Sequence, residues 1–378
     1  MTKAADPAPD ASRAPFGDPL AGWSNDDILL TKPARATLGA RHLRSLRVLD
    51  WPELRAQFSR HDAPANQHAS RSRGLGLGSV ASATAGLIVA GFAPLAGSSA
   101  PLIGATAASL CLAGIVSGAV HWLDRSAKAR WLGNRFWTER MRALYFQTLI
   151  NNLGLVAAAM RDDAALGEWK AARARALAAL PTPDDLTARI GKLTGNTGDD
   201  ETWVLADWVR TPPPPEPSEE LDIVFTLLRT QRFDSQIAYI DRKLGDSFRT
   251  PRRRSRVVQL GGQFLPTVAI VAALCIGIML LAGREPDGLM VRLALAVASG
   301  AVAAALALRM VNDDLKLSED ANRYAWYGAS VQAARTRFDA GDPGEKLAAL
   351  REMEIVAYHD LREFIAAHWR GRYVPQVW

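Results

Sequence analysis

Apolar residues are concentrated in four long blocks of the chain. The blocks span about residues 76–95, 102–122, 257–282 and 289–311, and six-residue turns join the first to the second and the third to the fourth. Each block reaches the roughly 20 residues that a helix needs to cross the hydrocarbon core. The blocks lack the polar stripe of a helix packed in a soluble domain, which disfavours buried hairpins in a large globular protein. The pattern predicts an all-α membrane protein with four transmembrane helices arranged as two hairpins.

The rest of the chain predicts helices and linkers around these hairpins. Asp50, Pro52 and Glu53 form a capping pattern for a short helix that is expected to end near Arg60. The proline run at 211–217 predicts a stiff extended linker and is the best candidate for a domain boundary. No alternating pattern predicts a strand of useful length.

The same pattern divides the chain into successive segments, with cytosolic helices extending from the hairpins. The segments are a disordered tail (1–41), a cytosolic helix with a basic flank (42–74), the first hairpin (75–122), a cytosolic helical region (123–210), the proline-rich linker (211–218), a second cytosolic helix with a basic flank (219–256), the second hairpin (257–311) and C-terminal cytosolic helices (312–378). Individual helices are expected at about 131–153, 166–180, 182–193, 218–248, 312–340 and 344–370. Residues 42–165 and 219–370 thus form a loose architectural repeat.

Arginine and lysine flank the spans on the side away from the two turns, and the turns hold only Arg284. The positive-inside rule therefore predicts a multi-pass inner-membrane protein with both termini and the long central segment in the cytoplasm. The net charge of +6 and the pI of about 9.5 are attributed to attraction of these flanks to lipid, and no nucleic-acid partner is expected. The strongest flank is predicted to anchor anionic lipid, with a nucleotide-phosphate site as the alternative. Its residues are Arg249, Arg252, Arg253, Arg254 and Arg256.

Patterns that support catalysis or metal binding are weak. Residues 191–198 have the composition of a phosphate loop, but their lysine precedes the glycines and no strand leads into them. The two cysteines fall in the middles of spans, where neither a disulfide nor a zinc site is supported. We therefore expect no enzyme activity, catalytic residue, metal or cofactor. The polar group that comes closest to a metal site lacks zinc-protease spacing and comprises His359, Asp360, Glu363 and His368.

The spans carry small residues and no Asp, Glu, Lys or His near their midpoints. A carrier is therefore disfavoured, because ion-coupled carriers need ionisable groups at depth. Gly114 and Gly118 have the spacing that lets helix backbones approach closely, either inside one hairpin or between subunits. The glycines predicted to pack helices are Gly74, Gly78, Gly114, Gly118 and Gly300.

Further residues give the chain a likeness to a known family. In the second half they are Gln236, Tyr239, Arg242, Lys243, Tyr324, Tyr327, the run 351–354, Glu363 and Trp369, and in the first half Trp131, Arg135, Thr138, Glu139, Arg140 and Arg142. This order of residues around a hairpin resembles the SLATT family, whose members are two-transmembrane effectors associated with SMODS and SLOG proteins. The likeness covers about two thirds of the chain, which differs in having two hairpins and a long insert between them.

The resemblance implies a bacterial membrane effector in a nucleotide-linked defence or conflict system. It would act as a homo-oligomer that forms a pore or depolarises the membrane, beside a partner protein that makes or senses nucleotides. The alternative is a non-catalytic scaffold or sensor that recruits a cytosolic partner, in which case residues 166–211 would capture that partner without conductance. A membrane enzyme is the third hypothesis, and loss of an activity in His359→Ala or Asp360→Ala would support it.

Overall fold

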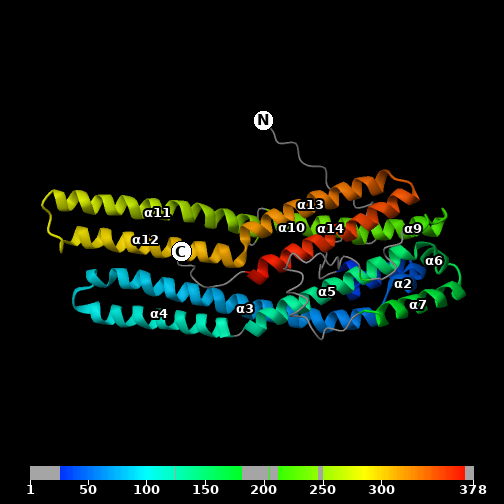
Figure 1. Ribbon diagram of the computed structural model, residues 1–378, viewed down its shortest axis with the longest axis horizontal. Coiled ribbons are helices and arrows are strands. Elements are labelled where there is room, and N and C mark those ends of the chain that lie inside the picture. Colours follow the sequence, from blue (N-terminus) through cyan, green and yellow to red (C-terminus); the bar gives the residue numbers. More distant parts are fainter. Residues whose placement is uncertain (1–25, 124, 181–203, 205–211, 246–249, 371–378) are drawn as a thin grey trace. The chain divides into compact units, whose positions relative to one another are not determined.

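The described residues fold mainly into helices (Figure 1). The computed structural model describes residues 26–123, 125–180, 204, 212–245 and 250–370. Across these ranges there is no strand, and four helices are long and apolar enough to cross a membrane. The predicted all-α membrane fold is therefore confirmed, whereas the helix expected at 182–193 lies outside the described residues.

The described residues fall into two compact units. The first unit comprises Met1–Ala63, Asn134–Lys243 and Arg323–Glu363, and the second comprises Pro64–Gly133, Leu244–Asn322 and Phe364–Trp378. Five of the described helices contribute residues to both units, because the division falls inside them. They are α3 (Pro52–Phe92), α5 (Arg125–Asn151), α10 (Ser235–Leu244), α13 (Leu317–Ala340) and α14 (Pro343–Arg370). The proline run, expected to mark a boundary, lies within the chain ranges of the first unit.

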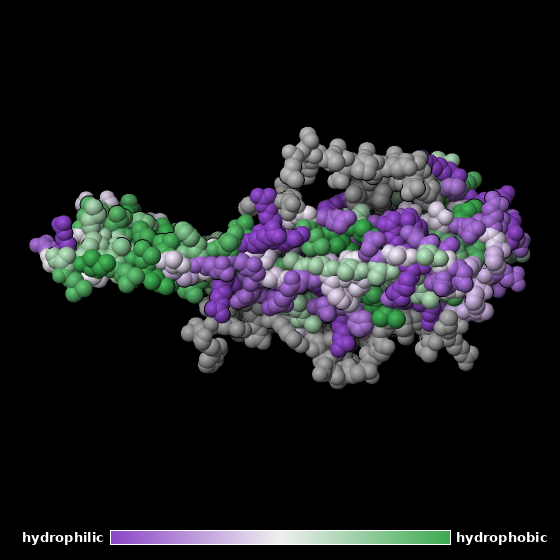
Figure 2. Space-filling model, turned by 90° about the horizontal axis from the view of Figure 1, so that it is seen from above, coloured by the Kyte–Doolittle hydropathy of each residue, from purple (hydrophilic) through white to green (hydrophobic). Residues whose placement is uncertain are grey.

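The second unit contains both predicted hairpins. The first pairs α3 (Pro52–Phe92) with α4 (Ala100–Leu123) through the short turns η3 (Ala93–Leu95) and η4 (Gly97–Ser99), and the second pairs α11 (Pro251–Leu281) with α12 (Leu289–Leu315). Only 6% of the most apolar window of α11 is buried by other parts of the chain. Figure 2 shows this surface as an apolar region. Leu, Ile, Val and Phe side chains left exposed in this way need a lipid environment.

The first span helix is longer than the sequence predicts. A separate helix was expected to end near Arg60, but α3 is continuous over 41 residues with Pro64 inside it. The helix begins at Pro52, while Asp50 ends the preceding helix α2 (Leu43–Leu49) and its carboxylate pairs with Arg55. Residues 60–75 contain no glycine–proline or asparagine–glycine break that would end a helix, which is why their polarity alone does not mark a boundary.

The first unit is a layered packing of helices from both halves of the chain. Its N-terminal part was predicted to be disordered up to residue 41, but η2 (Asp26–Ile28) and α1 (Lys32–Arg41) are formed and Leu38 is buried. The side chains of Tyr145 and Trp169 donate hydrogen bonds to main-chain oxygens of α2, at 3.1 and 2.9 Å. The other elements with residues in this unit are α5 (Arg125–Asn151), α6 (Leu153–Ala158), α7 (Asp163–Ala178), α9 (Glu219–Leu228), η6 (Arg229–Asp234), α10 (Ser235–Leu244), α13 (Leu317–Ala340) and α14 (Pro343–Arg370).

The segment expected to form one helix over 218–248 contains a change of helix type. Ser218 caps α9 by accepting a hydrogen bond from the backbone N–H of Leu221 at 3.2 Å. Between α9 and α10 the chain forms one π-helical turn, η6, in which the four residues 230–233 are all buried. A regular α-helix would turn part of this run towards solvent, whereas a wider turn keeps four successive side chains inside.

The helices after the second hairpin match their predicted limits closely. The fourth span continues to Leu315, and Lys316 in the left-handed region (φ 54°) separates it from α13. The last helix, predicted over 344–370, is α14. It starts with a reciprocal cap in which the carboxylates of Asp342 and Glu345 each accept the other residue's backbone N–H, at 2.9 and 3.1 Å.

Candidate functional site

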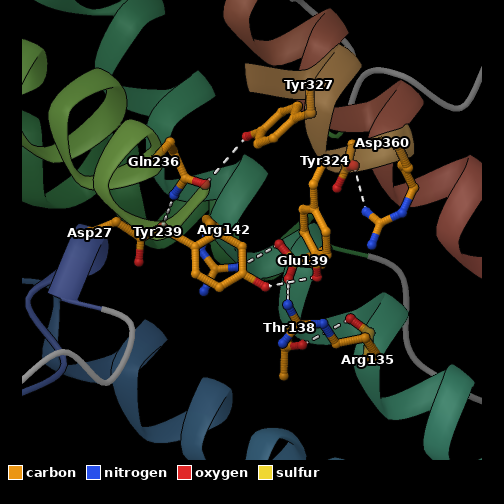
Figure 3. Close-up of polar contacts among 11 residues, drawn as sticks. Asp27, Arg135, Thr138, Glu139, Arg142, Gln236, Tyr239, Tyr324, Tyr327 and Asp360 are labelled. Carbon is orange, nitrogen blue, oxygen red and sulfur yellow. Dashed lines mark hydrogen bonds and ion pairs between the residues drawn. The ribbon is translucent and has the colours of Figure 1, made fainter. Parts of the chain in front are cut away.

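Buried polar side chains gather at one place inside the first unit (Figure 3). They come from η2, α5, α10, α13 and α14, which are far apart in the sequence. We call this cluster the polar seam. Its residues are Asp27, Arg135, Thr138, Glu139, Arg142, Gln236, Tyr239, Arg323, Tyr324, Tyr327 and Asp360.

Arg142 lies between two carboxylates of the seam. Its Nε lies 2.5 Å from Asp27 Oδ2, its Nη1 donates to Glu139, and its guanidinium lies 5.5 Å from the Phe58 ring centre. Burial raises the pKa of the Asp27 carboxyl, and the attraction of Arg142 offsets this only in part. Burial also acts to raise the pKa of Glu139, but Arg135 and Arg142 outweigh it and lower that pKa to about 2. Arg142 is therefore the central cation of the seam.

Asp27 connects the first half of the chain with the second. The side-chain amide of Gln236 on α10 donates to Asp27 Oδ2 at 3.4 Å, and the hydroxyl of Tyr327 on α13 donates to Gln236 Oε1 at 3.3 Å. A chain of polar contacts thus runs from α5, which follows the first hairpin in sequence, to α10 and α13, which flank the second. The seam links the helices that lead to each hairpin.

Two further contacts extend the seam towards α14. The hydroxyls of Tyr239 and Tyr324 lie 3.1 Å apart, and Arg323 Nη1 donates to Asp360 Oδ1 at 2.5 Å. Burial raises the pKa of Asp360 to about 6, even though Arg323 acts to lower it. The Asp360 carboxyl therefore changes its protonation near pH 6.

A deeply buried ion pair lies next to the seam. Arg232 Nη2 lies 2.6 Å from Glu354 Oε1, and the two side chains are only 2% and 1% exposed. The Arg232 guanidinium also lies 4.5 Å from the ring centre of Phe146, on the helix that follows the first hairpin. Removal of water from both charges costs several kcal/mol per ion in general, so this pair adds little net stability. A packing that separated the two charges would leave each buried without a partner, which disfavours other arrangements of these helices.

The residues that carry the family likeness are largely brought together. Arg135, Thr138, Glu139 and Arg142 from the first half meet Gln236, Tyr239, Tyr324 and Tyr327 from the second half in the polar seam. Glu354 pairs with Arg232, and Arg351 donates to Asn151 at 3.5 Å. Trp131 lies in the second unit instead, and Glu363 is exposed.

Sequence reasoning missed Asp27, Arg232 and Arg323. A signal for Arg323 exists, because Asn322-Arg-Tyr repeats the tripeptide pattern of Asn134-Arg-Phe at the matching place after the other hairpin. Asp27 has no such signal, since it lies next to a tract rich in proline and alanine. Its role depends entirely on contacts with distant helices.

The polar group on α14 does not form a metal site. Asp360 pairs with Arg323 in the first unit, His359 is exposed, and His368 belongs to the second unit, where its Nε2 lies 3.7 Å from Asp320. Within the described part of the chain no three His, Cys, Asp or Glu side chains are placed to hold a metal ion together. Cys111 is half-buried and Cys275 exposed.

The five predicted packing glycines divide into two groups. A Cβ added to Gly114 would lie 2.7 Å from the backbone nitrogen of Ala83, and one added to Gly118 would lie 2.8 Å from Ser79 Oγ, so both face α3 within the first hairpin. Gly74, Gly78 and Gly300 have nothing within 4 Å of an added Cβ. The sequence pattern missed Gly86, whose added Cβ would lie 2.8 Å from the main chain of α4.

The predicted basic flank lies at the start of α11. Arg252, Arg253, Arg254 and Arg256 are exposed in the first turns of the helix, whereas Arg249 lies outside the described residues. Cations at a helix N-terminus are opposed by the helix dipole, so this position is stabilised by an anionic environment.

No protein-family model, curated protein or solved structure matches this chain. The fold and the seam define its class: an all-α membrane protein with two apolar hairpins and a helical unit built around buried ion pairs.

Proposed function

We propose that this protein is a membrane effector whose first unit holds the two hairpins in a resting arrangement. The supporting observation is the polar seam, which joins helices that continue in sequence from both hairpins. When a partner protein or a nucleotide breaks the seam, the hairpins repack as a homo-oligomer and depolarise the membrane. A molecular switch needs an element with two discrete arrangements. A network of buried charges suits this role, because a partly formed network leaves buried polar groups without partners and is costly.

The likeness to SLATT proteins supports the finer parts of this proposal. It favours a bacterial inner-membrane location with both termini in the cytoplasm, and a role in a nucleotide-linked defence system. In this proposal the protein performs no catalysis itself, and the nucleotide acts as a signal.

The test weakens the seam and measures the membrane potential of living cells. Asp27→Asn keeps the size of the side chain but removes the charge that binds Arg142. If the resting state loses about 1.4 kcal/mol, the active fraction rises about tenfold. Cells producing Asp27→Asn should therefore lose membrane potential at an expression level at which the wild-type protein has no effect. A potential-sensitive dye reports this loss.

The matched control is Asp163→Asn, which removes the same charge from an ion pair with Arg47 that is largely exposed. Asp163→Asn should behave as the wild type. All three proteins must reach the membrane fraction in equal amounts. An unchanged potential in all three at every expression level would refute the effector proposal.

A second candidate function is a scaffold that recruits a cytosolic partner. It is favoured by an apolar pocket of about 300 Å³ in the first unit, lined by Pro212, Pro214, Leu347 and Ile355 among others. Under this alternative, purified protein in liposomes would give no conductance, and a Leu347→Asp variant would lose a specific partner while keeping its membrane insertion.

A further inference from the structure

One short segment of the first unit supplies a single carboxylate to the polar seam. It consists of Asp27 and Ile28 of the turn η2 and the two residues that lead from this turn towards α1. The side chains of Asp27, Ile28 and Leu29 are only 2%, 4% and 3% exposed. We call residues 27–30 the η2 segment. It is a small part of the unit that is inserted deeply among the other helices.

Opposite charge holds the η2 segment in the seam. Asp27 Oδ2 lies 2.5 Å from Arg142 Nε and accepts a hydrogen bond from the side-chain amide of Gln236 at 3.4 Å. Arg232 lies on η6, which packs against η2, and also attracts this carboxylate. Burial nevertheless raises the pKa of Asp27, so the attraction offsets only part of the cost of removing the carboxylate from water.

The backbone of the segment is strained at Leu29. Its φ of 56° lies in the left-handed region, where the Cβ atom of an L-residue comes too close to the following carbonyl oxygen. Glycine adopts this region freely and a short polar side chain can stabilise it, but leucine offers neither advantage. In the part of the chain that the structure describes, only Leu29 and Lys316 are non-glycine residues with a positive φ. Departure of the segment from the seam would release this strain.

One arginine of α1 clamps the strained connection. The Nη1 atom of Arg35 donates hydrogen bonds to the carbonyl oxygens of Leu29 and Leu30, at 2.8 and 2.9 Å. Arg35 is itself fixed by α1, whose N-cap Thr31 accepts a hydrogen bond from the backbone N–H of Ala34 at 3.3 Å. Hydrogen bonds from a charged donor are stronger than those between neutral groups. The guanidinium therefore holds the backbone in a conformation that it would not favour without this contact.

We propose that the η2 segment is an inhibitory latch, which leaves the polar seam as one piece while the rest of the first unit stays folded. Its departure withdraws the Asp27 carboxylate from Arg142, and this is the step that breaks the seam in the proposed function. The consequence for the membrane rests on that proposed function, whereas the opening of the latch can be measured without it. Backbone strain and the buried carboxylate favour opening, and Arg35 opposes it.

The first test measures how often the latch opens in the full-length protein purified in detergent. Ile28→Cys is made in a background with Cys111→Ser and Cys275→Ser, and the rate of its modification by a maleimide reports exposure of the thiol. Val48→Cys, at a completely buried position on α2, reports opening of the whole unit. Because local openings need less free energy than global unfolding, Ile28→Cys should react at least about tenfold faster than Val48→Cys.

Arg35→Met tests the clamp, because methionine favours a helix as arginine does but donates no hydrogen bond. It should raise the rate at Ile28→Cys about tenfold, which corresponds to a loss of about 1.4 kcal/mol, and leave the rate at Val48→Cys unchanged. The matched control is Arg44→Met, which removes the same charge from an exposed position on α2. Both rates should then stay within about twofold of their starting values.

Two results would overturn the latch. Equal rates at Ile28→Cys and Val48→Cys would mean that the segment opens only with the whole unit, and an unchanged rate at Ile28→Cys in Arg35→Met would mean that the arginine holds nothing. If Ile28→Cys itself releases the segment, hydrogen exchange of a peptide covering residues 27–38 replaces the thiol measurement. Exchange should be faster in Arg35→Met than in Arg44→Met, and equal exchange would refute the latch.

The second test measures the membrane potential of cells that produce Arg35→Met. The potential should fall as it does for Asp27→Asn, whereas cells producing Arg44→Met should match the wild type. If Asp27→Asn depolarises cells but Arg35→Met does not, although its latch opens, the latch is not the trigger and the inference is overturned. If neither variant depolarises cells although the latch opens, the effector proposal fails and the latch stands as a local opening of the fold.

Discussion

Arg142 shows how charge is arranged inside the first unit. It faces both Asp27 and Glu139, and the seam with its adjoining pair contains four arginines (135, 142, 232 and 323) and four carboxylates (27, 139, 354 and 360). These groups are largely removed from water, so loss of one partner leaves an uncompensated buried charge, which typically costs about 3–5 kcal/mol. The arrangement favours one geometry over others more than it adds stability.

Asp360 makes stability depend on pH in a direction that can be tested. Burial raises the pKa of its carboxyl from 3.8 to about 6. Between these values the folded protein holds a proton that the unfolded chain has released, so the contribution of this group to stability falls as the pH rises from 4 through 6. A shift of two units corresponds to at most about 3 kcal/mol.

The measurement compares the thermal unfolding midpoints of the wild type and Asp360→Asn in detergent between pH 4 and pH 7. The variant should gain stability relative to the wild type as the pH rises, because asparagine carries no charge that burial penalises. A difference between the two proteins that stays constant over this range would contradict the raised pKa.

At the residue scale, the sequence predicts the members of the seam only in part. Glu139, Arg142, Tyr324 and Tyr327 were indicated only as residues that carry the resemblance to the SLATT family. Asp27 could not be identified, because its carboxylate becomes important only through contacts with helices far away in the sequence. Charge pairing across several helices leaves no periodic trace in the sequence.

The helices themselves follow from local rules, while their limits depend on context. The length and apolarity of the spans predict α4, α11 and α12 well, because lipid exposure selects for both. The extent of α3 could not be predicted in this way, because its polar residues 60–72 continue the helix and hydropathy gives no signal for that. The π-helical turn η6 likewise could not be predicted, because it is associated with the burial of residues 230–233, and that burial depends on the neighbouring helices.

Helix contact in the first hairpin can be tested with three equivalent substitutions. A methyl group at Gly86 or Gly114 would lie within 2.8 Å of the main chain of the facing helix, which cannot move away without separating the pair. Gly86→Ala and Gly114→Ala should each lower stability by about 1–3 kcal/mol, the usual cost of overpacking. The unfolding midpoint in detergent measures this loss.

Gly78→Ala is the matched control, because nothing lies within 4 Å of its added Cβ. It should leave the midpoint unchanged or raise it, since alanine favours a helix over glycine by up to about 1 kcal/mol. Equal effects at all three glycines would mean that α3 and α4 do not approach each other as described.

At the scale of the whole molecule, apolar blocks and turns predict two hairpins, and the structure confirms them as candidate membrane spans. The sidedness of the hairpins rests on arginine distribution alone and remains a prediction. The polar seam adds a constraint, since Asp27, α5 and α13 meet in one unit and must therefore lie on the same side of the membrane. The contacts of the seam therefore predict that the turns of both hairpins lie on the same side of the membrane, which leaves two orientations to distinguish.

Cysteine labelling distinguishes the two remaining orientations. In a background with Cys111→Ser and Cys275→Ser, a membrane-impermeant maleimide is applied to bacterial spheroplasts carrying Ser98→Cys, Asp287→Cys or His359→Cys, all at exposed positions. The positive-inside rule predicts that the two turn positions react in intact spheroplasts, whereas the α14 position reacts only after permeabilisation. The reverse result would place the first unit outside the cell and end the proposal of a cytoplasmic trigger. Labelling of one turn alone would show that the hairpins are oppositely oriented and that the seam is not formed in the membrane.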